Sequence, residues 1–125
     1  MKKLVLESLC LLIYVDWMMR LEGLSALQRT LRNEQMRLKQ AHGIPPRDEL
    51  CRAIDLACAF YFKQVLCLQR SAATVLLLRR HGHPAEMVIG AQVLPFKSHA
   101  WVESDGVVVN DRPYVGDIYK PLERC

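Results

Sequence analysis

The sequence predicts an α+β domain in which N-terminal helices pack on a small antiparallel sheet. Its 125 residues allow one modest hydrophobic core, so we expect a single domain over residues 1–125. The apolar residues before His81 recur at helical spacing, and no glycine or proline lies between Arg47 and His81. After Gly82 and Pro84 the apolar residues alternate, which is typical of strands. Helices followed by strands favour separate helical and sheet layers.

The first expected element is a buried helix over residues 4–22. Two lysines followed by the apolar run 9–15 resemble the start of a secretory signal, which leaves a secreted or membrane-anchored form open. Against this, Glu7 and Asp16 bracket the run, no small-residue cleavage site follows it, and it is too short to span a bilayer. We therefore expect a cytoplasmic protein with no membrane partner.

A second helix is expected to follow Gly23 and to end at Gly43, just before two prolines. Ser25 and Gln28 have the spacing of a capping box at its start. Its leucines share one face and its basic residues lie elsewhere, which predicts an amphipathic helix.

The next stretch, without glycine or proline, would form a rod of about 52 Å as one helix, too long for a domain of this size. We expect a break between Phe62 and Leu66, so that Cys67 begins a new helix. The chain then divides into a helical part, residues 1–62, and a part made of the Cys67 helix and the sheet, residues 63–125.

The sheet is expected to form from short segments in the last third of the chain. Residues 87–89 are predicted to form a strand, residues 94–98 a loop, and residues 99–111 a hairpin that turns at an Asp-Gly pair. Residues 112–125 contain two prolines and a glycine and are expected to form an irregular tail.

The net charge of +4 is concentrated in the helices. Residues 20–80 contain eleven Lys or Arg against five Asp or Glu, whereas residues 81–125 contain four against six. This excess indicates either a surface for an acidic peptide or nucleic acid, or an ordinary solvated helix surface. The chain has no recognition-helix motif and no alternation of aromatic and basic residues, so we expect no nucleic-acid partner.

The five cysteines are an odd number and include neither a CxxC pair nor a zinc-ligand spacing. We therefore expect free thiols in a reducing compartment, with no metal site and no cofactor. Most cysteines and histidines are expected to be structural: Cys10 in the buried first helix, Cys51 and Cys58 on one core face, Cys125 at the terminus, and His42, His81 and His83 exposed beside turn glycines.

Cys67, His99 and Asp111 are the candidate catalytic group. A helix N-terminus favours a thiolate, and a neighbouring imidazolium lowers the pKa of a thiol further. His99 could protonate a leaving amine, and Asp111 could accept the other ring N–H and so fix the tautomer. A thiol, an imidazole and a carboxylate in this order indicate cysteine acyl-transfer chemistry.

The hairpin sets a geometric condition on this group. A two-residue turn at the Asp-Gly pair would place His99 opposite Arg112, with Asp111 on the other face. A three-residue loop that begins at Ser104 would instead place His99 opposite Asp111, about 5 Å away and within reach of a hydrogen bond. The triad therefore predicts the three-residue loop.

Each candidate also has a purely structural interpretation. Cys67 is then a small core residue, the ring of His99 hydrogen-bonds only to backbone groups, and Asp111 caps a turn.

The catalytic interpretation also needs donors that stabilise an oxyanion. The backbone N–H of Cys67 is the first expected donor, and the side chains of Gln64 and Tyr61 are the nearest others.

These residues belong to a longer series of motifs: CLQRS at 67–71, LLRRHGHPA at 77–85, VIG at 88–90, PF at 95–96, HAWVE at 99–103, DG at 105–106 and VND at 109–111. Together they resemble the transglutaminase-like cysteine peptidase family of lasso-peptide biosynthesis. The HAWVE motif alone would indicate only the wider transglutaminase-like superfamily. The first 60 residues resemble the family only as helices of suitable length.

The resemblance implies a transglutaminase-like or papain-like core with its triad at Cys67, His99 and Asp111. It implies removal of the leader from a ribosomally made precursor peptide through a thioester acyl-enzyme. The chain has no room for the leader-recognition domain of some members, which resembles the split form of the family. The implied partners are the precursor, a separate leader-recognition protein and the asparagine-synthetase-like cyclase.

Two other functions stay open. One is a transglutaminase-like amidase or acyltransferase with another acceptor, and the other is a non-catalytic α+β interaction module. In the peptidase interpretation, we expect the basic helical face to contact the leader or a partner protein through Arg29, Arg32, Arg37 and Arg52.

Overall fold

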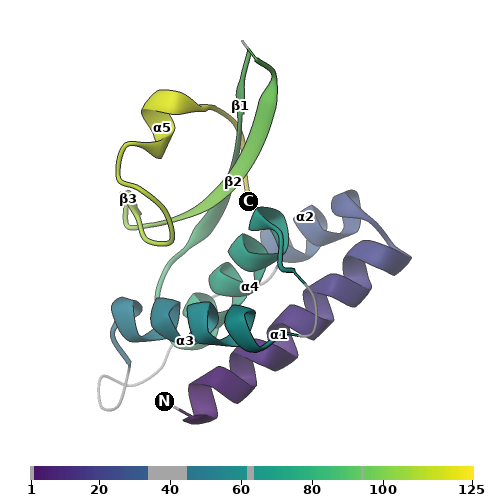
Figure 1. Ribbon diagram of the computed structural model, residues 1–125, viewed down its shortest axis with the longest axis vertical. Coiled ribbons are helices and arrows are strands. Elements are labelled where there is room, and N and C mark those ends of the chain that lie inside the picture. Colours follow the sequence, from purple (N-terminus) through teal and green to yellow (C-terminus); the bar gives the residue numbers. More distant parts are fainter. Residues whose placement is uncertain (1, 34–44, 62–63, 94) are drawn as a thin grey trace.

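The computed structural model describes residues 2–33, 45–61, 64–93 and 95–125 (Figure 1). Its helices are α1 (Lys2–Leu21), α2 (Leu24–Asn33), α3 (Arg47–Phe60), α4 (Cys67–Arg80) and the short α5 (Val115–Ile118). Its strands are β1 (Glu86–Gln92), β2 (Lys97–Ser104), β3 (Val107–Val108) and β4 (Lys120–Arg124), which form one antiparallel sheet in the order β3-β2-β1-β4. The predicted α+β class is confirmed.

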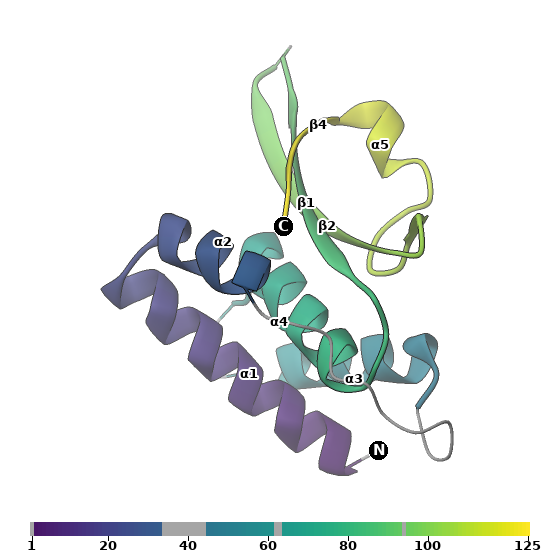
Figure 2. The same ribbon diagram turned by 180° about the vertical axis from the view of Figure 1, so that it is seen from behind.

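The sheet separates a large core from a small one. On one face, Ala100 and Val102 join the core that the helices form. On the other face, Val88 and Trp101 pack with Val115 in a second, smaller core. In both views the tip of the β1–β2 hairpin projects beyond the helices, and α5 lies on the opposite side of that hairpin from α2 (Figure 1 and Figure 2).

Helix α1 is buried on one side only. Leu12 and Val15 face the core, whereas Leu6 and Trp17 are 64% and 56% exposed, and Cys10 is exposed as well. The expectation of a buried first helix that contains Cys10 is therefore wrong for its outer side, because α1 lies at the outside of the helical layer and packs with α2, α3 and α4. No helix in the described ranges is long and apolar enough to cross a bilayer.

Helix α2 begins two residues earlier than the capping-box pattern requires. Leu24 is its first residue, and the N–H of Leu27 donates to the carbonyl of Gly23, which has a φ of +84°. Ser25 is therefore inside the helix, and the side chain of Gln28 instead donates a hydrogen bond to Glu123 of β4. The expected end of this helix, at Gly43, lies outside the described residues.

The predicted break before Cys67 is confirmed. Helix α3 ends at Phe60, and α4 begins at Cys67 after an extended Leu66 that makes no side-chain cap. Residues 71–78 of α4 are all buried, so α4 is the central helix of the large core. At its other end the N–H of His83 donates to the carbonyl of Leu78, across a left-handed Gly82.

Two expectations for the sheet region are wrong. Strand β2 already begins at Lys97, inside the expected loop 94–98. The expected irregular tail contains β4, which pairs with β1, and the backbone of Cys125 exchanges hydrogen bonds of 2.9 Å and 2.8 Å with Met87. All five residues of β4 are exposed, so this edge strand lacks the apolar alternation by which a strand is recognised.

His81 is buried rather than exposed as expected. Its Nε2–H donates to both carboxylate oxygens of Glu7, each 3.2 Å away, so it joins the end of α4 to α1. The ring of His83 donates to the carbonyl of Pro45 at 2.7 Å. His42 lies outside the described residues.

Candidate active site

Strand β2 presents His99 on the face of the sheet that carries the small core. Side chains alternate along a strand, so His99 shares this face with Trp101 and not with Ala100. The imidazole stacks on the Trp101 ring with 6.1 Å between centroids and lies 5.1 Å from the Tyr119 ring. Two aromatic rings therefore limit the orientations open to His99.

Asp111 is hydrogen-bonded to this ring. The Nε2–H of His99 donates to Asp111 Oδ2, and the backbone N–H of Arg112 donates to Asp111 Oδ1 at 2.7 Å. Burial raises the pKa of the Asp111 carboxyl, but the hydrogen bonds from His99 and Arg112 outweigh burial and hold that pKa below its ordinary value. The carboxylate form is therefore the stable one beside the imidazole.

The hairpin brings these residues together by a different route from the predicted one. Ser104 pairs with Val107, and both intervening residues have positive φ, 53° at Asp105 and 77° at Gly106, so the turn contains two residues. The predicted three-residue loop is wrong. The ladder ends after Val109, whose N–H donates to the carbonyl of Val102, and beyond it the chain bends toward His99. The register of the two-residue turn would place Asp111 on the opposite face of the sheet from His99, and this bend brings the two residues together.

Cys67 is the first residue of α4 and its side chain is exposed. Among the described side chains, no hydrogen bond links its thiol to His99. Helix α4 packs on the face of the sheet that carries Ala100 and Val102, whereas His99 lies on the other face. The structure thus brings His99 and Asp111 into contact and places Cys67 at the N-terminus of α4, without a contact between the thiol and His99 among the described residues.

One contact shows how the N-terminal half of α4 is positioned relative to β2. The hydroxyl of Ser71, one helical turn after Cys67, donates to the carbonyl of Ala100 at 3.1 Å. That carbonyl points to the same edge of β2 as the carbonyl of Val102, which bonds to Val109. In the described ranges β3 pairs only with Glu103 and Ser104, so the edge of β2 near His99 is open to α4.

The other predicted site residues are distributed around the helices. Gln64 is exposed just before α4, whereas the hydroxyl of Tyr61 donates to the buried Asp16 at 3.3 Å and so faces α1. Among the arginines expected to contact the leader or a partner, Arg29 and Arg52 are exposed, Arg32 forms an ion pair of 3.4 Å with Glu123, and Arg37 lies outside the described residues.

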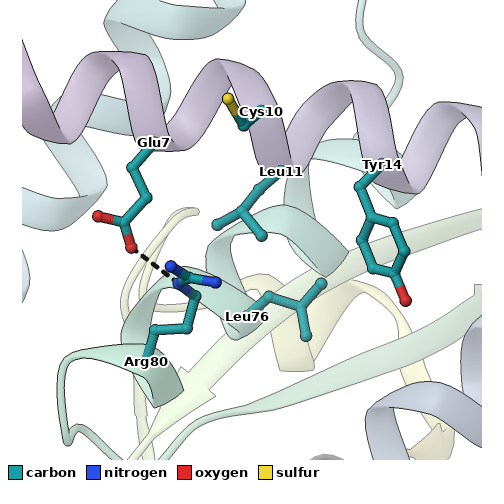
Figure 3. Close-up of a pocket in the computed structure, with 6 residues that line it drawn as sticks. All are labelled: Glu7, Cys10, Leu11, Tyr14, Leu76 and Arg80. Atoms are coloured by element: carbon teal, nitrogen blue, oxygen red, sulfur yellow. Dashed lines mark hydrogen bonds and ion pairs between the residues drawn. The ribbon is translucent and has the colours of Figure 1, made fainter.

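A cavity of about 360 Å³ lies directly beside the histidine–aspartate pair. It is lined by His99, Asp111, Arg112, Val115, Ile118 and Tyr119. A second cavity of about 310 Å³ lies between α1 and α4, where Glu7 pairs with Arg80, and none of the predicted site residues line it (Figure 3). The described part of the chain holds no cluster of three His, Cys, Asp or Glu side chains arranged for a metal ion.

Two residues that contact this site were missed at the level of sequence, Ser71 and Asn110. The side-chain amide of Asn110 donates to Ser71 Oγ at 3.1 Å and accepts the N–H of Val102 at 2.7 Å. Their positions in the sequence are close to the candidate residues, since Ser71 is one helical turn from Cys67 and Asn110 directly precedes Asp111, but position alone did not indicate their contacts.

Comparison with known proteins gives two matches. Residues 10–124 match the sequence model of the transglutaminase-like superfamily. The microcin J25-processing protein McjB of Escherichia coli is 43% identical over 51 residues, which are 41% of this chain and 24% of McjB. The matched segment thus spans about a quarter of that protein. No solved structure matches the chain. Because the superfamily match covers nearly the whole sequence, the chain belongs to the transglutaminase-like superfamily.

Proposed function

We propose that the protein is a cysteine peptidase that removes the leader from a lasso-peptide precursor. The observation that carries this proposal is the hydrogen bond from His99 to Asp111, in a chain whose central helix begins at Cys67. The superfamily match and the similarity to McjB, whose name describes the processing of microcin J25, support a peptide substrate.

In the first step the thiol of Cys67 becomes a nucleophile. Asp111 binds the Nε2–H of His99, so the lone pair of the neutral ring is on Nδ1, and Nδ1 takes the thiol proton. The thiolate attacks the carbonyl carbon of the last leader residue. The backbone N–H of Cys67 is unused within the helix, because it belongs to the first turn, and it stabilises the oxyanion.

In the second step the peptide C–N bond breaks. The proton on His99 Nδ1 moves to the leaving nitrogen, which frees the N-terminal amine of the core peptide and leaves the leader as a thioester on Cys67. Water then attacks the thioester while Nδ1 takes its proton. The leader leaves with a carboxylate, and the thiol of Cys67 regains its proton.

The reaction requires the thiol to reach Nδ1 across the open edge of β2. The bond from Ser71 to the Ala100 carbonyl holds the N-terminal half of α4 at that edge. Catalytic hydrogen bonds are often completed only when substrate is bound, and the cavity beside His99 offers space for a side chain that flanks the cleaved bond. The precursor and a separate leader-recognition protein are the proposed partners, with the cyclase acting afterwards.

The test is leader removal by the purified protein and its Cys67→Ala variant. Each is incubated with the precursor encoded beside it and with the leader-binding protein, and the products are identified by mass spectrometry. Cys10→Ala is a matched control, because Cys10 is also an exposed thiol but lies within α1. We expect cleavage by the wild type and by Cys10→Ala, and at least about a 10³-fold loss in Cys67→Ala.

Cleavage that survives Cys67→Ala would exclude the covalent mechanism. Transfer of the leader acyl group to an added amine in place of water would instead identify an acyltransferase. Absence of any reaction with precursor and partner together would favour the non-catalytic interaction module.

A further inference from the structure

The amide of Asn110 substitutes for a backbone carbonyl at the end of the β2–β3 ladder. In a continued ladder the N–H of Val102 would donate to the carbonyl of Val109, which already donates its own N–H to Val102 at 3.0 Å. The N–H of Val102 instead donates to Asn110 Oδ1 at 2.7 Å. The buried N–H is therefore satisfied while the backbone is free to leave the sheet after Val109.

This departure determines where Asp111 goes. Continuing the register of the two-residue turn would place Asp111 opposite Ala100, on the face that carries the large core. His99 lies on the other face, so an extended strand could not join the two residues. The bend at Asn110 brings the Asp111 carboxylate to the imidazole.

The same side chain is also bonded to α4. Asn110 Nδ2 donates to Ser71 Oγ at 3.1 Å, and Ser71 donates its hydroxyl hydrogen to the carbonyl of Ala100 at 3.1 Å. Ser71 is fully buried, so its hydroxyl both accepts and donates within the protein. Each of the three bonded residues lies close in the sequence to a proposed triad residue: Ser71 is one helical turn from Cys67, Ala100 follows His99, and Asn110 precedes Asp111.

We propose that Ser71 and Asn110 are positioning residues. They hold the side chains of Cys67, His99 and Asp111 in place relative to one another. This inference rests on the proposed peptidase function. Asn110 produces the contact between His99 and Asp111 through its bond to Val102, and the bond between Asn110 and Ser71 fixes the start of α4, with Cys67, against that pair. Neither residue touches the substrate.

The test uses Ser71→Ala, Asn110→Ala, the double variant and a control, Thr74→Val. Thr74 is a buried hydroxyl on the same helix, but its bond of 2.7 Å goes to the carbonyl of Arg70 within α4. We expect Ser71→Ala to lower kcat about 10- to 100-fold with KM nearly unchanged, because the thiol is misplaced while the substrate still binds. Thr74→Val should retain wild-type kcat.

A second measurement reports the histidine–aspartate bond directly. The proton on His99 Nε2 is followed by NMR, and its resonance is assigned by its loss in His99→Gln. We expect Asn110→Ala to shift or abolish it, and Ser71→Ala and Thr74→Val to leave it in place. The loss of kcat in the double variant should be smaller than the product of the two single losses, because both single substitutions already remove the bond between Asn110 and Ser71.

Wild-type kcat in Ser71→Ala, or an unchanged His99 resonance in a folded Asn110→Ala, would overturn the inference. An equal loss of kcat in Thr74→Val would do the same, because it would indicate a general effect on α4. If the wild type removes no leader, the proposed function fails, and the His99 resonance alone then decides whether Asn110 positions the pair.

Discussion

At the scale of single residues, three of the five thiols have a pKa above that of an ordinary cysteine. Burial, followed by the nearby carboxylates of Asp55 and Asp48, raises the pKa of Cys51 to about 11. Burial also raises the pKa of Cys58 and that of Cys125. Cys10 and Cys67 are the exposed thiols, so they are the ones open to reagents in solution.

Alkylation should therefore separate the thiols into two groups. At pH 7 we expect iodoacetamide to modify Cys67 and Cys10 well before Cys51, Cys58 and Cys125. Cys67 should react about three-fold faster than Cys10, because a helix N-terminus favours the thiolate and the middle of a helix does not. Peptide mapping by mass spectrometry at several times gives each rate. Equal rates for Cys67 and the half-buried Cys58 would contradict an activated thiol.

The contact between His99 and Asp111 was predictable from residue types and order, but the way it forms was not. Counting residues around the hairpin assumes that the ladder continues to Asp111. A side-chain amide can replace a backbone carbonyl, as Asn110 does. The number of residues in the turn then no longer determines which side chains lie on the same face and contact each other. Sequence alone does not show which polar side chain will make such a substitution, so Asn110 and Ser71 were missed.

At the scale of elements, strand β1 packs closely against the indole ring of Trp101, which stacks on His99. A Cβ added at Gly90 would lie 2.7 Å and 2.8 Å from ring atoms of Trp101 and 3.1 Å from the carbonyl of Lys120. Gly90 also pairs directly with His99 across the β1–β2 ladder. The glycine thus leaves space for the indole that stacks on His99.

We predict that Gly90→Ala destabilises the protein by about 1–3 kcal/mol, because the fully buried Trp101 must shift. Unfolding in urea, followed by tryptophan fluorescence and circular dichroism, measures the change. Gly116→Ala is the control, since a Cβ there has no neighbour within 4 Å. Comparable destabilisation of both variants would show that contact with Trp101 is not the cause.

The helices were more predictable from the sequence than the strands. The length of the stretch before His81 and the size of the domain required a break, and α4 does begin at Cys67. Strand β4 was missed because its residues are exposed on both faces and include Pro121, so only pairing with β1 identifies it as a strand. The pattern of apolar residues shows which side of a segment can be buried. An exposed edge strand has no such pattern, so it is identified only by the hydrogen bonds to its neighbouring strand.

At the scale of the whole molecule, Glu7 joins the first helix to the end of the central one. It accepts a hydrogen bond from Arg80 at 2.8 Å (Figure 3). It also accepts one from His81 at 3.2 Å. Burial raises the pKa of Glu7, but the bonds from Arg80 and His81 outweigh burial and hold that pKa below its usual value of 4.5. The carboxylate therefore binds its proton less readily in the folded protein than in the unfolded chain.

A lowered pKa in the folded state stabilises the protein above the unfolded value, and this contribution is lost as the pH falls through the folded value. We predict that Glu7→Gln lowers the free energy of unfolding by about 1–2 kcal/mol at pH 7. The difference from wild type should shrink steadily below about pH 4.5. Urea unfolding across that range measures it.

Glu22→Gln, at an exposed carboxylate just after α1, is the matched control and should leave stability unchanged. A difference between Glu7→Gln and wild type that stays constant down to pH 3 would show that Glu7 contributes through packing and not through its charge.

The pairing of β4 with the central strand has a consequence for how the protein is made. Gln28 and Arg32 of α2 bond to Glu123, at separations of 95 and 91 residues, and β1 obtains its second neighbour only from residues 120–124. During synthesis the helices can pack while one edge of β1 is still unpaired, and open strand edges promote association between chains. Residues 120–124 must therefore leave the ribosome before the sheet that carries His99 is closed, and slow translation of the segment between β1 and β4 would prolong the period in which nascent chains can aggregate.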